Sequence, residues 1–173
     1  MKKKIIFTLT LAMLMTGVFS ACASADPNRP KWAKDVPPHG VIWGIGSARQ
    51  ATESLSRTFA ETRARVSIAR QMGGTVKLMF NGIDEKTGQA LEEHFSVMLT
   101  SVTLGGTRTL QRWQAPDGAE WCLMEYNKVE AKKLLEDFLD SDAVRVTGVN
   151  VEKALKTLDA ELAKKTKPIL ITQ

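Results

Sequence analysis

Side chains that commonly catalyse reactions or bind metals are few in this sequence of 173 residues. Its two histidines, His39 and His94, lie far apart and lack the close spacing that is typical of metal ligands. Neither lies in a pattern with serine or cysteine that indicates a nucleophile and its base, and the carboxylates form no signature for acid–base catalysis. We therefore expect no catalytic residue, no metal site and no cofactor, and a protein that is not an enzyme.

Cys22 is the residue for which the surrounding sequence predicts a chemical modification. It follows Phe19-Ser20-Ala21, which resembles the bacterial lipobox, although Leu, Val or Ile is usual where Phe19 stands. In that motif the cysteine becomes the first residue and is acylated on sulfur. Several acyl chains would hold the protein stably, because each buried methylene contributes about 0.8 kcal/mol and one chain alone binds marginally. The motif predicts lipid attachment at Cys22 and a membrane-tethered protein.

Two other fates of this region stay open. Ala23-Ser24-Ala25 followed by Asp26 fits the small-x-small pattern of ordinary signal peptidase, and cleavage there would release a soluble secreted domain. A disulfide between Cys22 and Cys122 would suit an oxidising compartment. Cys122 lies in a strand-like run, however, where a free cysteine usually acts as a small buried hydrophobic residue. We favour lipidation over both.

Residues 1–21 have the features of an exported bacterial signal peptide. Three lysines precede an apolar stretch from Ile5 to Phe19, which is shorter than the roughly 20 apolar residues that a spanning helix needs. No later stretch is long and apolar enough to cross a bilayer. The formal net charge of +5 includes these three lysines and is +2 without them, which argues against a nucleic-acid partner.

The remaining 150 or so residues suit one domain and predict an α+β fold. We expect a strand at about 41–46 and a long helix at about 48–72, with Ser47 and Gln50 as its capping box. Gly44-Ile45-Gly46 would form the tight turn between them. Because Arg49 replaces the third glycine of a dinucleotide fingerprint, a nucleotide site is not favoured.

The apolar side chains of the long helix predict its buried face. The large residues of this broad face are Leu55, Phe59, Val66 and Met72, and alongside them lie Ala51, Ala60, Ala64, Ile68 and Ala69. Gly73-Gly74 is expected to end the helix. The arginines between 57 and 70 are spread around the helix and accompanied by glutamates, so we interpret them as a solvated surface.

The second half of the chain predicts a hairpin and three further helices. The strands of about 106–114 and 120–126 flank Pro116-Asp117-Gly118, a turn sequence, and complete a small antiparallel sheet. The residues from 75 to 104 are ambiguous: Val76, Leu78 and Phe80 alternate as in a strand, but a helical stripe favours a helix at about 89–102 after a turn. Asn127 and Glu130 have the spacing of a capping box for a helix at about 128–140, and a last helix, at about 150–165, is expected to begin near Asn150.

The leading segment 22–40 is rich in proline and predicts a flexible, lipidated arm between the membrane and the domain. Trp32 is its large apolar residue. We expect Trp32 to pack the arm onto the domain rather than to form a platform for a ligand.

Three segments together resemble the Lpp-twenty family of bacterial lipoproteins. They are Trp43 to Gly46, the step Leu104-Gly105-Gly106, and the hairpin from Trp113 to Met124, in the same order as in the family. The resemblance covers about residues 31–139 and implies an α+β domain at 41–140, followed by a C-terminal helical extension at 141–173. Related domains occur in the flagellar assembly protein FlgT, and the family has no catalytic residues to transfer.

The resemblance and Cys22 together imply a lipoprotein of the bacterial envelope, a non-catalytic binding or structural module with an envelope protein as partner. Ala23 and Ser24 after the cysteine favour sorting to the outer membrane, with the domain facing the periplasm or the surface. We expect the partner to contact an apolar patch on the last helix or an exposed sheet edge. The alternative is a soluble periplasmic ligand-binding protein, released by cleavage after Ala25.

Overall fold

The computed structural model describes residues 26–81, 83–164 and 166–172, so the predicted signal peptide and Cys22 lie outside the described residues. It confirms the α+β class. The sheet has four strands in the order β2-β3-β1-β4. They are β1 (Val41–Ala48), β2 (Arg108–Gln114), β3 (Glu120–Asn127) and β4 (Leu170–Ile171). β1 and β2 are antiparallel to β3, whereas β4 is parallel to β1, so the sheet is mixed rather than wholly antiparallel.

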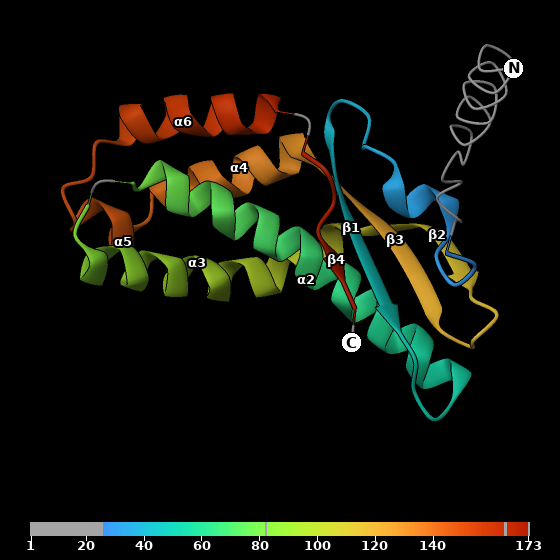
Figure 1. Cartoon of the computed structure of the whole chain (residues 1–173). Coiled ribbons are helices and arrows are strands. Elements are labelled where there is room, and N and C mark those ends of the chain that lie inside the picture. Colours follow the sequence, from blue (N-terminus) through green and yellow to red (C-terminus); the bar gives the residue numbers. More distant parts are fainter. Residues whose placement is uncertain (1–25, 82, 165, 173) are drawn as a thin grey trace, which may run out of the picture.

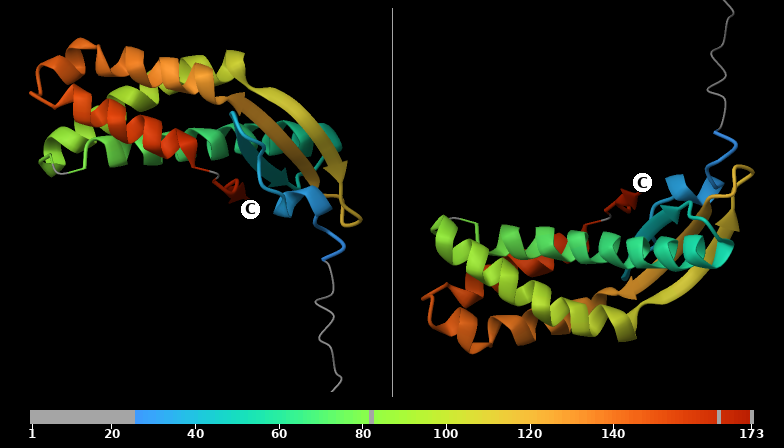
Figure 2. Two further views of the ribbon diagram at one scale, coloured as in Figure 1. Left: turned by 90° about the horizontal axis from the view of Figure 1, so that it is seen from above. Right: turned by 90° about the horizontal axis from the view of Figure 1, so that it is seen from below.

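One long helix, α2, runs the length of the molecule, with the sheet packed against one half and the other helices against the other half (Figures 1 and 2). The helices are η1 (Lys31–Lys34), α2 (Glu53–Met79), α3 (Glu85–Gly106), α4 (Lys128–Leu139), α5 (Asp142–Arg145) and α6 (Val151–Ala163). The core at the helical end contains Phe138, whose ring Phe80 and Phe95 contact at centroid distances of 6.0 and 5.2 Å. None of the helices among the described residues is long and apolar enough to cross a bilayer.

Both predicted ends of the long helix were wrong. The capping box of Ser47 and Gln50 does not form, because β1 continues through Ala48 and the helix begins after Thr52, whose side chain accepts from the Leu55 amide. Gly73-Gly74 does not stop the helix, which continues to Met79. Two helical glycines cost about 1 kcal/mol each relative to alanine. Burial of Val76, Met79 and Phe80 in the core offsets this cost.

The predicted buried face of α2 was correct only in part: Met72 and the accompanying Ala60, Ala64 and Ile68 are buried, but three of the large apolar residues are not. Leu55, Phe59 and Val66 are 47, 45 and 39% exposed. Small residues instead face the sheet, namely Ser56, Ala60, Ala64 and Ser67, with Ile68 beside them. Helical periodicity locates an apolar stripe, but it does not say whether that stripe or a stripe of small residues meets the sheet.

The two glycines of β1 explain why the small face is the buried one. They lie inside the strand rather than in the predicted turn, and both face α2. A Cβ atom on Gly44 would stand 2.1 Å from the carbonyl oxygen of Ala64, and one on Gly46 would stand 2.2 Å from that of Ala60. Helix and strand backbones are therefore in direct contact, which leaves no room for a leucine or phenylalanine between them.

The ambiguous segment from 75 to 104 is helical on both sides of a short turn. Val76 and Leu78 belong to the last turns of α2 rather than to a strand. α3 begins four residues earlier than predicted, because the Asp84 side chain caps it by accepting from the Thr87 amide at 2.9 Å. Of the predicted stripe of Leu91, Phe95, Met98 and Val102, the first two are buried and Met98 is partly buried, whereas the side chain of Val102 lies outside the described part; Leu99, which was not predicted, is buried with them.

The hairpin is confirmed, with Trp113 opposite Trp121 and Gly118 at a φ of +86° in the turn. β2 begins at Arg108, since α3 extends to Gly106. Asn127 caps α4 as predicted, and α6 begins next to Asn150, which caps it. The short α5 and the terminal strand β4 were not predicted, and both depend on contacts with distant parts of the chain.

Candidate functional site

The face of the sheet turned away from α2 contains all four tryptophans of the sequence. Trp32 of η1 meets Trp121 edge to face, with centroids 6.5 Å apart and an interplanar angle of 82°. This confirms that Trp32 packs the arm onto the domain. Trp43 donates to the Glu125 carboxylate at 3.2 Å, and Trp113 packs on the same cluster. These rings are used in packing the arm against the sheet.

Three of the four exposed large apolar residues of α2 lie on one side of the helix, and we call them the α2 stripe: Leu55, Phe59 and Val66; the fourth, Leu78, lies near the end of the helix. Spacings of four and seven residues place them on one side of the helix, opposite the face that packs on the sheet. Scattered exposed apolar residues are normal, but several on one side of a helix are typical of a protein interaction site. The α2 stripe is the first candidate site.

The arginines of α2 do not gather into an anion-binding face. Arg57 pairs with Glu53 at 2.6 Å, and Arg65 pairs with Glu61 at 3.8 Å. Arg63 instead donates to the Ser47 carbonyl of β1 at 2.5 Å. These interactions agree with the predicted solvated surface, and exposed pairs of this kind contribute little to stability.

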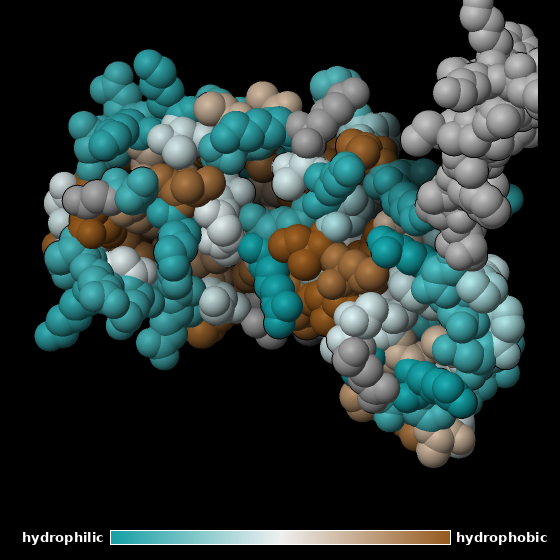
Figure 3. Space-filling model, viewed as in Figure 1, coloured by the Kyte–Doolittle hydropathy of each residue, from teal (hydrophilic) through white to brown (hydrophobic). Residues whose placement is uncertain are grey.

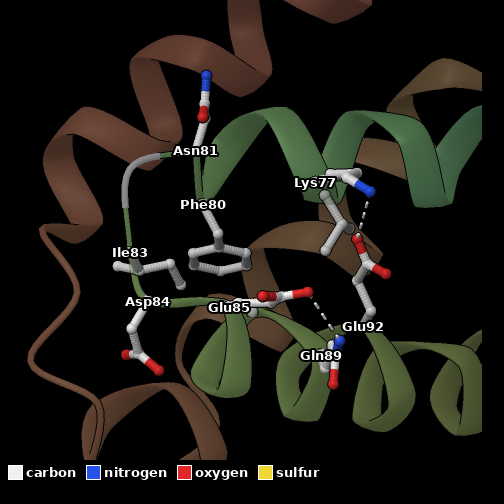
Figure 4. A pocket seen from close by; sticks show the side chains of 10 residues that line it. Lys77, Phe80, Asn81, Ile83, Asp84, Glu85, Gln89 and Glu92 are labelled. Carbon is white, nitrogen blue, oxygen red and sulfur yellow. Dashed lines mark hydrogen bonds and ion pairs between the residues drawn. The ribbon is translucent and has the colours of Figure 1, made fainter.

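The second candidate site is a shallow cavity of about 290 Å³ at the corner where α2 meets α3 (Figure 4). Phe80 and Ile83 supply apolar surface, and Lys77 lies 4.0 Å from Glu92 at the rim. Hydrogen bonds from Thr87 hold the pKa of the nearby Asp84 carboxyl below its ordinary value. The volume is at the lower end of the range for small-molecule sites, and the polar groups are positioned for binding rather than for proton transfer.

The predicted chemical residues are not brought together. His39 is exposed in the arm, and His94 stacks on Phe138 at a centroid distance of 5.8 Å. Over the described ranges, no three histidine, cysteine or acidic side chains are grouped so as to hold a metal ion. Cys22, for which the sequence predicts lipid attachment, lies outside the described residues.

Cys122 is a free, buried thiol of β3, as its strand-like surroundings predicted. Burial, with a smaller contribution from the charge of Glu61, raises the pKa of this thiol from 9.0 to about 11. A thiol with so high a pKa is protonated at neutral pH and is a poor nucleophile. Its role is packing between the sheet and α2.

The raised pKa predicts an alkaline loss of stability that Cys122→Ala should reduce. Between the ordinary pKa of 9.0 and about 11 the unfolded chain loses the thiol proton while the folded chain keeps it, so stability falls as pH rises. We expect urea unfolding to show that the free energy of unfolding falls less between about pH 8 and about pH 10 in the variant than in the unaltered chain, by the order of 1 kcal/mol. Equal falls in both proteins would contradict burial of the neutral thiol.

Comparison of the chain with models of known protein families, with curated proteins and with solved structures finds no match. The candidate sites therefore rest on the structure itself.

Sequence reasoning missed both candidate sites. A signal for the α2 stripe was present: Ser56, Ala60, Ala64 and Ser67 recur at helical spacing, after a strand with two glycines. Small residues on both partners favour close packing, which would have placed the large apolar residues outside. The α2–α3 cavity had no such local signal, because it depends on how the two helices cross.

Proposed function

We propose that this chain is a membrane-tethered lipoprotein of the bacterial envelope, similar to the Lpp-twenty family, that acts as a non-catalytic binding or structural module. The observation that carries the binding role is the α2 stripe, three exposed apolar side chains on one side of the longest helix. The leader and the lipobox-like sequence before Cys22 support the tether and an outer-membrane location. The expected partner is another protein of the envelope.

The position of the arm supports a defined orientation for such a tethered domain. Residues 26–34 lie beside the sheet, at the end of the molecule away from α3, α5 and α6 (Figure 1). Trp32 and Ala33 pack on the sheet there, and Arg29 donates to the Ala33 carbonyl at 3.2 Å. A lipid on Cys22, four residues before Asp26, would therefore hold the sheet end of the domain nearest the membrane.

The α2 stripe, rather than the last helix, is the surface we propose for the partner. The apolar side chains of α6, among them Leu155, Leu158 and Leu162, pack inward on the core. The exposed edge of β2 remains the other candidate from the sequence. It carries Arg108 and Arg112, and charged residues on an edge strand discourage pairing with another chain.

A soluble periplasmic ligand-binding protein is the second candidate, and the cavity between α2 and α3 is the observation that favours it. It requires cleavage after Ala25. The two hypotheses differ in the mature amino terminus, which is an acylated Cys22 in the first and an unmodified Asp26 in the second.

A double substitution, Leu55→Ser with Phe59→Ser, tests the binding role. Burying one such side chain at an interface contributes about 1.5 to 3 kcal/mol, so recovery of the envelope partner with the tagged protein should fall at least about tenfold. Unfolding should change little, because both residues are exposed. The measurement is quantitative mass spectrometry of proteins that co-purify from detergent-solubilised envelopes.

Val129→Ser is the matched control, since Val129 is 74% exposed on α4 and lies outside the α2 stripe. It should leave recovery unchanged. Unaltered recovery in the double variant would remove the α2 stripe from the proposal.

A further inference from the structure

The edge of β1 that faces away from β3 binds a short extended strand, β4. We call this edge, together with the adjoining side of α2, the groove. β4 pairs with only two residues of β1, matching Leu170 to Ile45 and Ile171 to Gly46. On the two sides of this pairing, side chains of α2 cap the β1 carbonyls: Gln71 donates to Trp43 at 2.8 Å, and Arg63 donates to Ser47 at 2.5 Å. Side chains of α2 therefore satisfy two β1 carbonyls on either side of the short pairing with β4.

A buried hydroxyl of α2 also requires a strand in this groove. Ser67 is completely buried, and its Oγ donates to the Ile169 carbonyl that immediately precedes β4. Without an occupant, this hydroxyl and the β1 edge would lose their hydrogen-bond partners beside an apolar surface. The groove thus selects an extended segment with a carbonyl opposite Ser67 and an apolar side chain opposite Ile45.

The segment that fills the groove in the structure is loosely attached. Leu170 and Ile171 are only half-buried, and Ile169 is 39% exposed. Apolar side chains gather openly over β4 and the adjoining part of β1 in Figure 3. Between α6 and β4, the described residues 164 and 166–169 belong to no helix or strand, so they can act as a hinge.

We propose that the C-terminal strand of one copy docks on β1 of a second copy, forming a reciprocal, strand-exchanged dimer. The second copy is the occupant because its Leu170 and Ile171 reproduce every contact that β4 already makes with β1 and Ser67. Exchange then changes only the hinge between α6 and β4, and exchange of identical elements is a low-cost route to a closed dimer. Intramolecular docking is favoured in dilute protein, and a high local concentration favours the dimer. The exchange needs no lipid anchor.

Two single-cysteine chains test the exchange directly. Both begin at Asp26 and carry Cys122→Ala; one has Ile45→Cys and the other has Leu170→Cys, and the two carry different tags. Parallel neighbours in a sheet are about 4.8 Å apart, which suits a disulfide. After oxidation of a concentrated mixture, the yield of the heterodimer linked through positions 45 and 170 should be several-fold higher than the heterodimer yield of a control mixture. The control mixture contains Ile45→Cys and Val129→Cys chains and measures disulfides formed by random collision.

If Ile45→Cys does not fold, sedimentation of the chain without new cysteines provides an independent test, because it measures the dimer fraction directly. The dimer fraction should rise with concentration, fall severalfold in Leu170→Asp and persist in Val129→Asp. A heterodimer yield equal to the collision control, or a chain that stays monomeric at every concentration, overturns the proposal. A dimer that Leu170→Asp does not weaken also overturns it, because its interface then lies elsewhere.

Discussion

Gly44→Ala is expected to lower the free energy of unfolding by about 3 kcal/mol or more, the upper range for overpacking a core. The added methyl carbon would stand 2.1 Å from the Ala64 carbonyl oxygen and 2.7 Å from an Ile68 side-chain carbon. The first of these is a helix backbone atom, so relief requires α2 to move away from β1. Such a movement would open the contact between helix and sheet along the row of small residues.

Chemical denaturation followed by circular dichroism measures this loss, and Gly74→Ala provides a matched control. Gly74 lies in α2, and a Cβ there would meet nothing within 4 Å. That substitution should raise stability by about 0.5 to 1 kcal/mol, because alanine favours a helix more than glycine does. Equal stability of Gly44→Ala and the unaltered chain would show that α2 does not approach β1 this closely.

Cys22→Ala is expected to move the protein from the membrane fraction to the soluble fraction. Each buried methylene of an acyl chain contributes about 0.8 kcal/mol to membrane binding. The total that is lost with several chains far exceeds the membrane-binding free energy that a domain of net charge +2 could supply. The measurement is fractionation of cells that produce the full chain, together with the intact mass of the mature protein. The unaltered protein should begin at Cys22 and carry the mass of its acyl groups.

Cys122→Ala is the control for Cys22→Ala, because it removes the other cysteine and leaves the lipobox-like sequence intact. It should remain with the membranes. A mature chain that begins at Asp26 without added mass would reject the tether and favour the soluble periplasmic protein. The stability result for Gly44 does not depend on this outcome.

Signals confined to a few neighbouring residues were sufficient for much of the fold. Asn127 caps a helix as predicted, since capping depends on a side chain and an amide two residues away. The Pro116-Asp117-Gly118 turn places Trp113 opposite Trp121 in the predicted hairpin for the same reason. Together with the long helix, these local features were enough to predict the α+β class.

Contacts between distant residues decided the rest. Gly44 and Gly46 were predicted to form a turn, and only their contact with α2 gives them a packing role; that contact also determines which face of α2 stays exposed. β4 is too short to predict from its own residues, because its pairing depends on the edge of β1 and on Ser67. The sequence alone therefore determined the types of the main elements and the cap of α4. Only the tertiary structure decided which surfaces they bury, because backbone approach and strand pairing depend on residues far apart in the chain.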